Sequence, residues 1–423
     1  MSILARLRGL ARFDALVLTA SLWFLGKFLR YAFPPLFGTL GKTYGVSRTV
    51  LGTAFTGFML VYAAMQFPSG ALADRLGSVR VIAGGATLAA TGALVLVVDS
   101  PFAVLAVAMV LMGAGTGAYK TVAVRLLSRI YPARTGRALG VFDTFGTFGG
   151  VAAPAAVVAV GGLSLLAGAP WRLVFLAGGL ATVGLAVVFA RRVPRRLSGP
   201  ADGSGAATDT GPDSAEDAAP DSDTDTGDTP LRAYLTMFRE WQFTAFVVVT
   251  ILFSFAYNGA VAFLPLYLAS ETALSAATAN LLFSALFVVS VVQLVTGEAS
   301  DRVGTEPVLV LTLGVATAGL VAVLALSASG GPLVLGAAVV ALGLGAHGYR
   351  PVRGAYLMAV VPEGVAGGSL GVVRTLLMGA GAIAPAIVGW LSEVASFQVA
   401  FGLLAVALVG ATGLTLSLWL LDD

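Results

Sequence analysis

Four ionisable side chains lie inside long apolar stretches of this sequence: Lys27, Arg30, Asp143 and Arg374. A charge placed in a hydrocarbon layer costs ~2.5–3.5 kcal/mol on insertion scales, so each of them needs a reason to be there. Cations in such a place attract anions, and a carboxylate can pair with a cation or carry a proton. The residue types therefore indicate anion binding, charge pairing or proton transfer in an apolar protein.

Lys27 and Arg30 are three residues apart and share one face of the helix that we expect there. If this helix begins near Phe13, Lys27 lies ~21 Å along its axis, and Arg30 lies about one turn further. We predict that both attract an anionic ligand, with Lys27 the stronger candidate. The alternative is that they extend to the surface or bond an adjacent carbonyl group.

Asp143 and Arg374 occupy matched positions in the two copies of an internal repeat. Opposite charges at equivalent depths in two halves predict an inner gate. Asp143 could instead meet Arg350 or Arg353, and Arg374 could meet Asp74. A further alternative makes Asp143 a proton-titrating carboxylate.

Uncharged polar side chains add candidates for the wall of a binding cavity: Tyr62, Gln66, Tyr257, Asn258 and Gln293. Gln66 and Gln293 occupy matched positions of the repeat, so their match could equally reflect packing within it. We expect four further cations to end their helices on the cytoplasmic side, as headgroup or gate contacts: Lys120, Arg125, Arg350 and Arg353.

The elements that position these side chains follow from composition. Of 423 residues, 57% are hydrophobic and 11% charged, whereas soluble proteins carry about 25% charged residues. Apolar runs of roughly 20 residues match the length that spans a bilayer. We predict an all-α integral membrane protein with twelve transmembrane helices, at about 13–37, 50–70, 79–98, 101–123, 138–160, 172–190, 242–267, 274–296, 307–327, 332–352, 367–390 and 396–420.

Basic residues predict the orientation in the membrane. With the N-terminus inside, most arginines fall on the cytoplasmic side, and the outside receives only Lys42, Arg48 and Arg172. We expect a multi-pass protein of the cell membrane with both termini in the cytoplasm, surrounded by the lipid bilayer.

Residues 197–230 contain nine acidic residues and no basic one. This tract has almost no large apolar side chain, which predicts a disordered cytoplasmic linker. The predicted organisation is an N-terminal six-helix bundle at 1–195, the linker at 196–235 and a C-terminal six-helix bundle at 236–423. The linker is interpreted as a tether, with a regulatory docking segment as the alternative. Acidic residues with few lysines are typical of salt-loving organisms.

A charged turn follows the second helix and recurs in part after the eighth. The first copy contains Gly70, Asp74, Arg75, Gly77 and Arg80, and the second contains Gly297, Asp301, Arg302 and Gly304. We expect Gly77 to adopt a positive φ and Gly70 to let a neighbouring helix approach closely. Matched prolines at Pro35 and Pro265 and at Pro154 and Pro385 support the same repeat, which is parallel because six helices return the chain to the same side.

With these motifs the chain resembles the major facilitator superfamily (MFS). The turn from Gly70 to Arg80 matches the signature loop of that family in full, whereas Pro307 replaces the last basic residue in the second copy. The resemblance implies two bundles related by pseudo-two-fold symmetry, alternating access and a monomer. It also implies that Asp74 latches onto the start of the eleventh helix when the cytoplasmic side is closed. The alternative is a solvated turn that sets topology through Arg75 and Arg80.

Several classes of site are excluded by composition. There is no cysteine and His347 is the only histidine, which rules out disulfides, iron–sulfur clusters and multi-histidine metal sites. The sequence shows no phosphate-binding loop, and its carboxylates are scattered. We therefore expect no cofactor, no metal, no nucleic acid partner and no enzymatic activity.

The function predicted from the sequence is secondary active transport of a small-molecule substrate, favouring a small organic anion because of Lys27 and Arg30. An ion gradient, most simply of protons, or substrate exchange would drive it. The main alternative is proton-coupled multidrug efflux with Asp143 as the titrating group. A non-transporting receptor or a channel of the same fold is a further alternative.

Overall fold

The structure is a computed structural model that describes residues 13–163, 169–194, 239–360 and 366–421. Every regular element in these ranges is helical, and twelve helical stretches are long and apolar enough to cross a membrane, as the sequence predicted. The first elements are α2 (Asp14–Tyr31), α3 (Phe33–Tyr44), α4 (Arg48–Leu76), α5 (Ser78–Val95), α6 (Phe102–Ile130), η2 (Pro132–Arg134), α7 (Thr135–Val160) and α8 (Arg172–Arg192). They are followed by α11 (Trp241–Glu271), α12 (Ala276–Val288), η4 (Val289–Val291), α13 (Val292–Val303), α14 (Thr305–Ala325), α15 (Pro332–Val360), α16 (Ala366–Val394) and α17 (Phe397–Leu421).

Two of the predicted helices are interrupted. The helix predicted at 13–37 is divided into α2, which ends at Tyr31, and α3, which begins at Phe33 and extends beyond residue 37. Helix α3 carries Pro34 and Pro35 in its first turn. Proline is tolerated in a first turn because the N–H groups there have no partner in the helix. The eighth predicted helix consists of α12 and α13 joined by the short 3₁₀ segment η4.

The chain divides into two compact units. The first unit is Met1–Ala32 with Val61–Ala218, and the second is Phe33–Leu60 with Ala219–Asp423. This grouping assigns 33–60 to the second unit, whereas the sequence assigned these residues to the N-terminal half. The predicted boundaries at 195 and 236 and the predicted linker lie outside the described residues.

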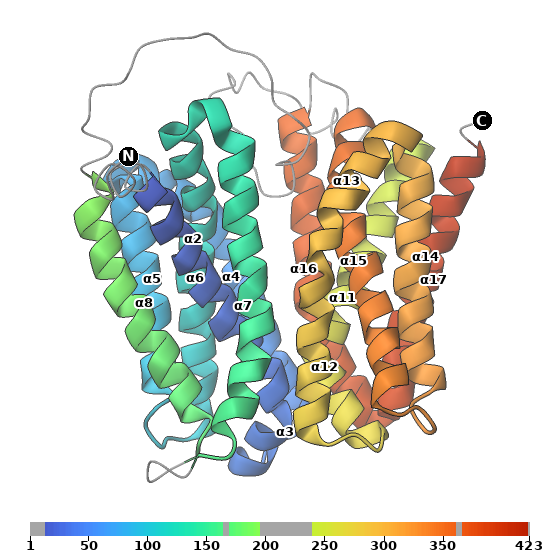
Figure 1. The fold of residues 1–423 in the computed structure, drawn as a ribbon, viewed down its shortest axis with the longest axis horizontal. Helices are drawn as coiled ribbons and strands as arrows, with labels where there is room; N and C mark the ends of the chain where they lie inside the picture. Colours follow the sequence, from blue (N-terminus) through green and yellow to red (C-terminus); the bar gives the residue numbers. More distant parts are fainter. Residues whose placement is uncertain (1–12, 164–168, 195–238, 361–365, 422–423) are drawn as a thin grey trace, which may run out of the picture. The chain divides into compact units, whose positions relative to one another are not determined.

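In the first unit, α2 packs against α7, and α5 packs against α6 and α8 (Figure 1). Three aromatic side chains join these helices in a buried core: Trp23, Tyr119 and Phe142. The Trp23 and Phe142 rings stack with centroids 5.7 Å apart, and Tyr119 meets Trp23 edge to face at 6.2 Å. The Tyr119 hydroxyl donates a hydrogen bond to the Leu22 carbonyl at 2.9 Å, which fixes α6 against α2.

A glycine of α7 allows that helix to approach α2 closely. A Cβ atom at Gly149 would lie 2.5 Å from the carbonyl oxygen of Phe24 and 2.8 Å from the nitrogen of Phe28. Real Cβ atoms do not come so near to backbone atoms, so only glycine permits this spacing. The close contact brings the first half of α7, which carries Asp143, beside Trp23 of α2.

The second unit contains α11 to α17 together with α3 and the first part of α4. Phe37 of α3 packs edge to face on Phe263 of α11, with ring centroids 5.1 Å apart. The backbone N–H of Ala386 in α16 donates to Thr56 Oγ1 of α4 at 3.1 Å. The second unit therefore holds the segment 33–60 through both aromatic and polar contacts.

Candidate functional site

Helix α2 carries the two cations that the sequence singled out. The Lys27 ammonium lies 5.0 Å from the centroid of the Trp23 ring and 5.6 Å from that of Tyr31. The Arg30 guanidinium lies 5.4 Å from the Tyr31 ring and 5.7 Å from the ring of Tyr62 on α4. Since both cations contact Tyr31, they lie on one side of α2, in agreement with their spacing. Cations over aromatic faces are stabilised by the ring quadrupole in an apolar environment.

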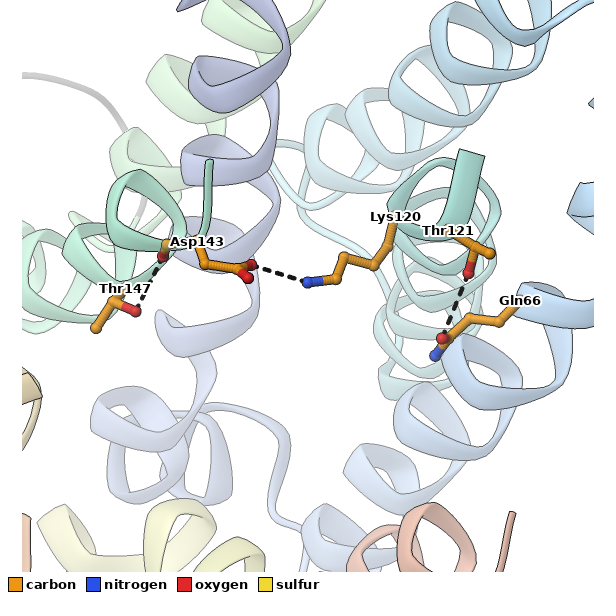
Figure 2. A network of polar contacts seen from close by, with 5 residues as sticks. All are labelled: Gln66, Lys120, Thr121, Asp143 and Thr147. Carbon is orange, nitrogen blue, oxygen red and sulfur yellow. Dashed lines mark hydrogen bonds and ion pairs between the residues drawn. The ribbon is translucent and has the colours of Figure 1, made fainter. Parts of the chain in front are cut away.

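A third cation, Lys120 of α6, lies on the same tryptophan. Its ammonium is 4.5 Å from the Trp23 centroid and 5.2 Å from that of Phe142. It also forms an ion pair with Asp143 Oδ1 of α7 at 3.0 Å (Figure 2). The Lys120 side chain is 3% exposed, whereas that of Asp143 is 46% exposed. The buried cation therefore meets a carboxylate that its own unit covers only in part.

Polar side chains flank this ion pair on both sides (Figure 2). The hydroxyl of Thr121, next to Lys120, donates to Gln66 Oε1 of α4 at 3.5 Å. The hydroxyl of Thr147 donates to the backbone carbonyl of Asp143 at 3.1 Å, one turn along α7. Gln66, which the sequence predicted to line a cavity, is buried and accepts this hydrogen bond from a side chain of its own unit.

The pairing of Asp143 with Lys120 differs from the sequence expectation. The sequence placed Lys120 at the cytoplasmic end of its helix and offered Arg350 or Arg353 as partners for Asp143. Helix α6 instead continues to Ile130, so Lys120 lies ~15 Å from its end. A lysine at that depth needs a counter-charge within its own bundle, and Asp143 supplies it. In the repeat, Tyr119-Lys120 matches Tyr349-Arg350.

The second unit contains a corresponding cluster around Tyr257 of α11. The Tyr257 ring stacks on Phe253 at 5.8 Å, and the Arg350 guanidinium of α15 lies 4.7 Å from the Tyr257 centroid. His347 is buried and meets the Tyr257 ring edge to face at 6.1 Å. Asn258, the neighbouring candidate, donates to the Ser254 carbonyl at 2.9 Å, so its amide is held along α11. The structure thus brings Tyr257 and Arg350 together.

The remaining candidates of the second unit lie on separate helices. Arg353 is buried, with its guanidinium 5.9 Å from the Tyr349 ring on the same helix. Arg374 on α16 and Gln293 on α13 are half-buried. Asp143 and Arg374 belong to different units, so a gate that includes both stays a prediction.

The two charged turns share one backbone feature. Gly77 and Gly304 have φ values of 86° and 94°, which confirms the positive φ expected at Gly77 and extends it to the second copy. A Cβ at Gly70 would meet no atom within 4 Å among the described residues. The close approach of a neighbouring helix at Gly70 stays a prediction.

The charged side chains of these turns bond locally. Asp74 Oδ1 pairs with Arg125 of α6 at 2.5 Å, and Arg302 pairs with Glu298 one turn before it. Arg75, Arg80 and Asp301 are exposed, and Gly297 is buried. The start of the eleventh predicted helix lies partly outside the described residues, so the latch from Asp74 to that helix stays a prediction.

The two clusters have an excess of positive charge. The cluster of the first unit contains three cations, Lys27, Arg30 and Lys120, with the carboxylate of Asp143, and the cluster of the second unit contains Arg350. Among the described residues no group of three or more His, Cys, Asp or Glu could hold a metal ion. The chemistry that this arrangement offers is attraction and orientation of an anion.

Comparison with known proteins identifies the family. The sequence profile of the Major Facilitator Superfamily matches residues 19–335 and, in a second match, 246–423. The chain belongs to the Major Facilitator Superfamily. Members of this family are secondary transporters rather than enzymes, so this MFS chain moves a small molecule across a membrane.

Solved MFS structures share the fold. The nucleoside transporter NupG superimposes with a TM-score of 0.74 at 13% identity, covering 96% of this chain and 100% of NupG. A bacterial homologue of the human lysosomal transporter Spinster gives 0.72 at 15% identity, covering 95% of this chain and 96% of that one. FucP gives 0.60 at 16% identity, covering 96% and 99%. Identities this low show the fold alone.

One curated relative is similar in sequence over part of the chain. A probable sulfoacetate transporter, SauU, of Cupriavidus necator is 28% identical over 147 residues. The match covers 34% of this chain and 33% of the relative, so the chain aligns with about a third of that protein.

Proposed function

We propose that this MFS transporter carries a small organic anion. The observation that supports this most is the pair of lysines on one tryptophan: the Lys27 and Lys120 ammonium groups lie 5.0 and 4.5 Å from the Trp23 ring centroid. Two cations at one ring repel each other, and the carboxylate of Asp143 offsets one of these charges. The positive potential of these side chains attracts an anionic substrate.

Recognition of the substrate by its charge agrees with the rest of the site. Arg30 lies near the rings of Tyr31 and Tyr62, and Arg350 lies over Tyr257. A guanidinium offers several donors in a fixed plane and suits carboxylate or sulfonate oxygens. The probable sulfoacetate transporter SauU, similar over 147 residues, is named for a substrate of this class. Carboxylates and sulfonates of a few carbon atoms are therefore the substrates to test first.

The remaining features of this proposal come from the family and the charge pattern. Alternating access would expose the cations first to one side of the membrane and then to the other. The driving force would be a proton gradient or exchange against another anion. The protein would act as a monomer in the cell membrane with both termini in the cytoplasm.

A ligand panel tests the substrate class. Purified protein is heated with sulfoacetate, acetate, malonate or sulfate, and separately with lipophilic cations such as tetraphenylphosphonium. We expect an organic anion to raise the unfolding temperature in a concentration-dependent way and the lipophilic cations to leave it unchanged. Stabilisation by lipophilic cations alone would replace this proposal with multidrug efflux, for which Asp143 is the titrating candidate.

A further inference from the structure

We propose that Asp143 is the resident counter-ion of Lys120 and that the anionic group of the substrate replaces it during transport. This inference rests on the proposed anion transport and names the cation that receives the charge of the substrate. It assigns opposite roles to the two partners of one ion pair, a fixed cation and an exchangeable carboxylate.

Burial makes Lys120 the fixed partner. Its side chain is 3% exposed, and its ammonium lies beside the stacked rings of Trp23 and Phe142, 4.5 and 5.2 Å from their centroids. These rings stack on each other in the core of the first unit, so they leave the ammonium little freedom to move. An ammonium in such surroundings requires a negative partner at all times.

Asp143 has the opposite character. Its side chain is 46% exposed, although its Oδ1 atom is 3.0 Å from the Lys120 ammonium. The short aspartate side chain leaves the ion pair by rotation about its own bonds, without movement of α7. The Thr147 hydroxyl bonds the backbone carbonyl of Asp143, so it does not restrain this rotation. The carboxylate is therefore the partner that an incoming anion replaces.

Lys27 adds a second positive charge at the Trp23 ring, where the exchange takes place. Lys27 and Lys120 both lie within 5.0 Å of the Trp23 centroid. An anion that reaches Trp23 meets the charges of both lysines, and Asp143 then turns away from Lys120. The exchange fits a ligand that presents one carboxylate or sulfonate to the first unit, because one anionic group then replaces another beside Lys120.

The repeat shows that the carboxylate is specific to one half of the chain. The residues of the second repeat that match Lys120 and Asp143 are Arg350 and Arg374. Both are cations, so they cannot form the equivalent ion pair. A carboxylate needed only to hold two neighbouring helices together would be useful in both halves. Its presence only beside Lys120 fits a role in substrate exchange.

Asp143→Asn tests the exchange because it keeps the shape of the side chain and removes its charge. The readout is the dissociation constant for sulfoacetate, from calorimetry on the purified full chain. In the unmodified protein, Asp143 occupies Lys120 most of the time, so only a small fraction of the molecules can bind the anion. The apparent dissociation constant equals the intrinsic one divided by that fraction. We therefore expect about tenfold tighter binding in Asp143→Asn, where this competition is removed. Lys120→Met should abolish binding, and the double variant should bind no better than Lys120→Met.

Asp99→Asn is the matched control. Asp99 forms an ion pair with Arg172 outside the cluster and is exposed, so its neutralisation should leave the dissociation constant unchanged. Asp143→Ser serves as a second neutral variant, and thermal unfolding verifies that each protein is folded. Failure of both Asp143 variants to fold would mark the pair as a structural contact and overturn the proposal.

The outcomes separate this inference from the proposed function. If the unmodified protein binds sulfoacetate but Asp143→Asn binds it equally or more weakly, the inference is wrong and anion transport stands. The inference is also wrong if the double variant keeps the gain of Asp143→Asn. If the unmodified protein binds no anion of the panel, the proposed function fails, and the inference fails with it.

Discussion

Lys120 and Arg350 occupy matched positions in the two repeats, and each lies over an aromatic ring of the first helix of its half. The Lys120 ammonium is 4.5 Å from the Trp23 centroid on α2, and the Arg350 guanidinium is 4.7 Å from the Tyr257 centroid on α11. Cation–π contacts of this kind contribute ~0.5–2 kcal/mol, more where water is excluded. Each half of the repeat therefore holds one cation in a defined position in the interior of a helix.

The contact between Arg350 and Tyr257 can be tested by removing the aromatic face. Tyr257→Leu keeps an apolar side chain but lacks the ring that attracts the guanidinium. We expect a loss of ~0.5–2 kcal/mol in the free energy of unfolding. Tyr257→Phe keeps the ring and is the matched control, with an expected loss well below that of the leucine variant. Thermal unfolding in detergent measures both, and equal losses would show that the ring face does not hold Arg350.

Lys27 should contribute to anion binding through its charge. Lys27→Gln removes the charge from the Trp23 ring and keeps a polar chain, so the KM for anion transport should rise about tenfold, since one charge-assisted contact is lost. Lys27→Arg keeps the charge and should retain much of the activity. Transport in reconstituted vesicles measures both variants. An unchanged KM in Lys27→Gln would assign Lys27 the structural role that the sequence left open.

Glu393 forms a contact that sequence reasoning did not identify. Its carboxylate accepts hydrogen bonds from the backbone N–H groups of Arg48 and Thr49 and from the Thr49 hydroxyl, at the N-terminus of α4. The Arg48 guanidinium lies 4.2 Å from the Phe397 ring centroid and donates to the Ser392 carbonyl at 3.4 Å. A carboxylate at a helix N-terminus satisfies N–H groups that have no partner within the helix.

Removal of this cap should lower stability. Glu393→Ala is expected to cost about 1 kcal/mol of unfolding free energy, as capping substitutions do. Glu298→Ala is the control, because Glu298 forms an exposed pair with Arg302 on its own helix, and such pairs contribute only about 0.3–0.5 kcal/mol. Thermal unfolding of both variants measures the difference. A larger loss in the control than in Glu393→Ala would contradict the capping role.

Gly149 should be essential for the contact between α2 and α7. Gly149→Ala places a Cβ atom 2.5 Å from the carbonyl oxygen of Phe24, so the helices must separate, at a cost of roughly 1–3 kcal/mol. Gly140→Ala in the same helix meets no atom within 4 Å and should be neutral or stabilising, because alanine favours helix more than glycine does. Thermal unfolding distinguishes the two, and equal effects would show that α7 adapts to the extra methyl group.

The sequence was informative where local chemistry decides structure. Runs of apolar residues predicted all twelve helices, and the spacing of glycine in the charged turn predicted the positive φ of Gly77. The contact of Lys120 with Asp143 could not be predicted, because it depends on how far α6 extends and on how α6 and α7 are rotated about their axes. An error of a few residues in a helix end alters both. The contact of Glu393 with α4 joins residues far apart in the chain and has no local signal.

Anion transport is tested most directly by counterflow. The purified protein is reconstituted into vesicles that are loaded with unlabelled sulfoacetate, and labelled sulfoacetate is added outside. We predict transient, saturable accumulation of the label that acetate or malonate reduces and tetraphenylphosphonium does not. A protein that accumulates no organic anion of the panel but moves lipophilic cations under the same conditions would contradict the proposed function.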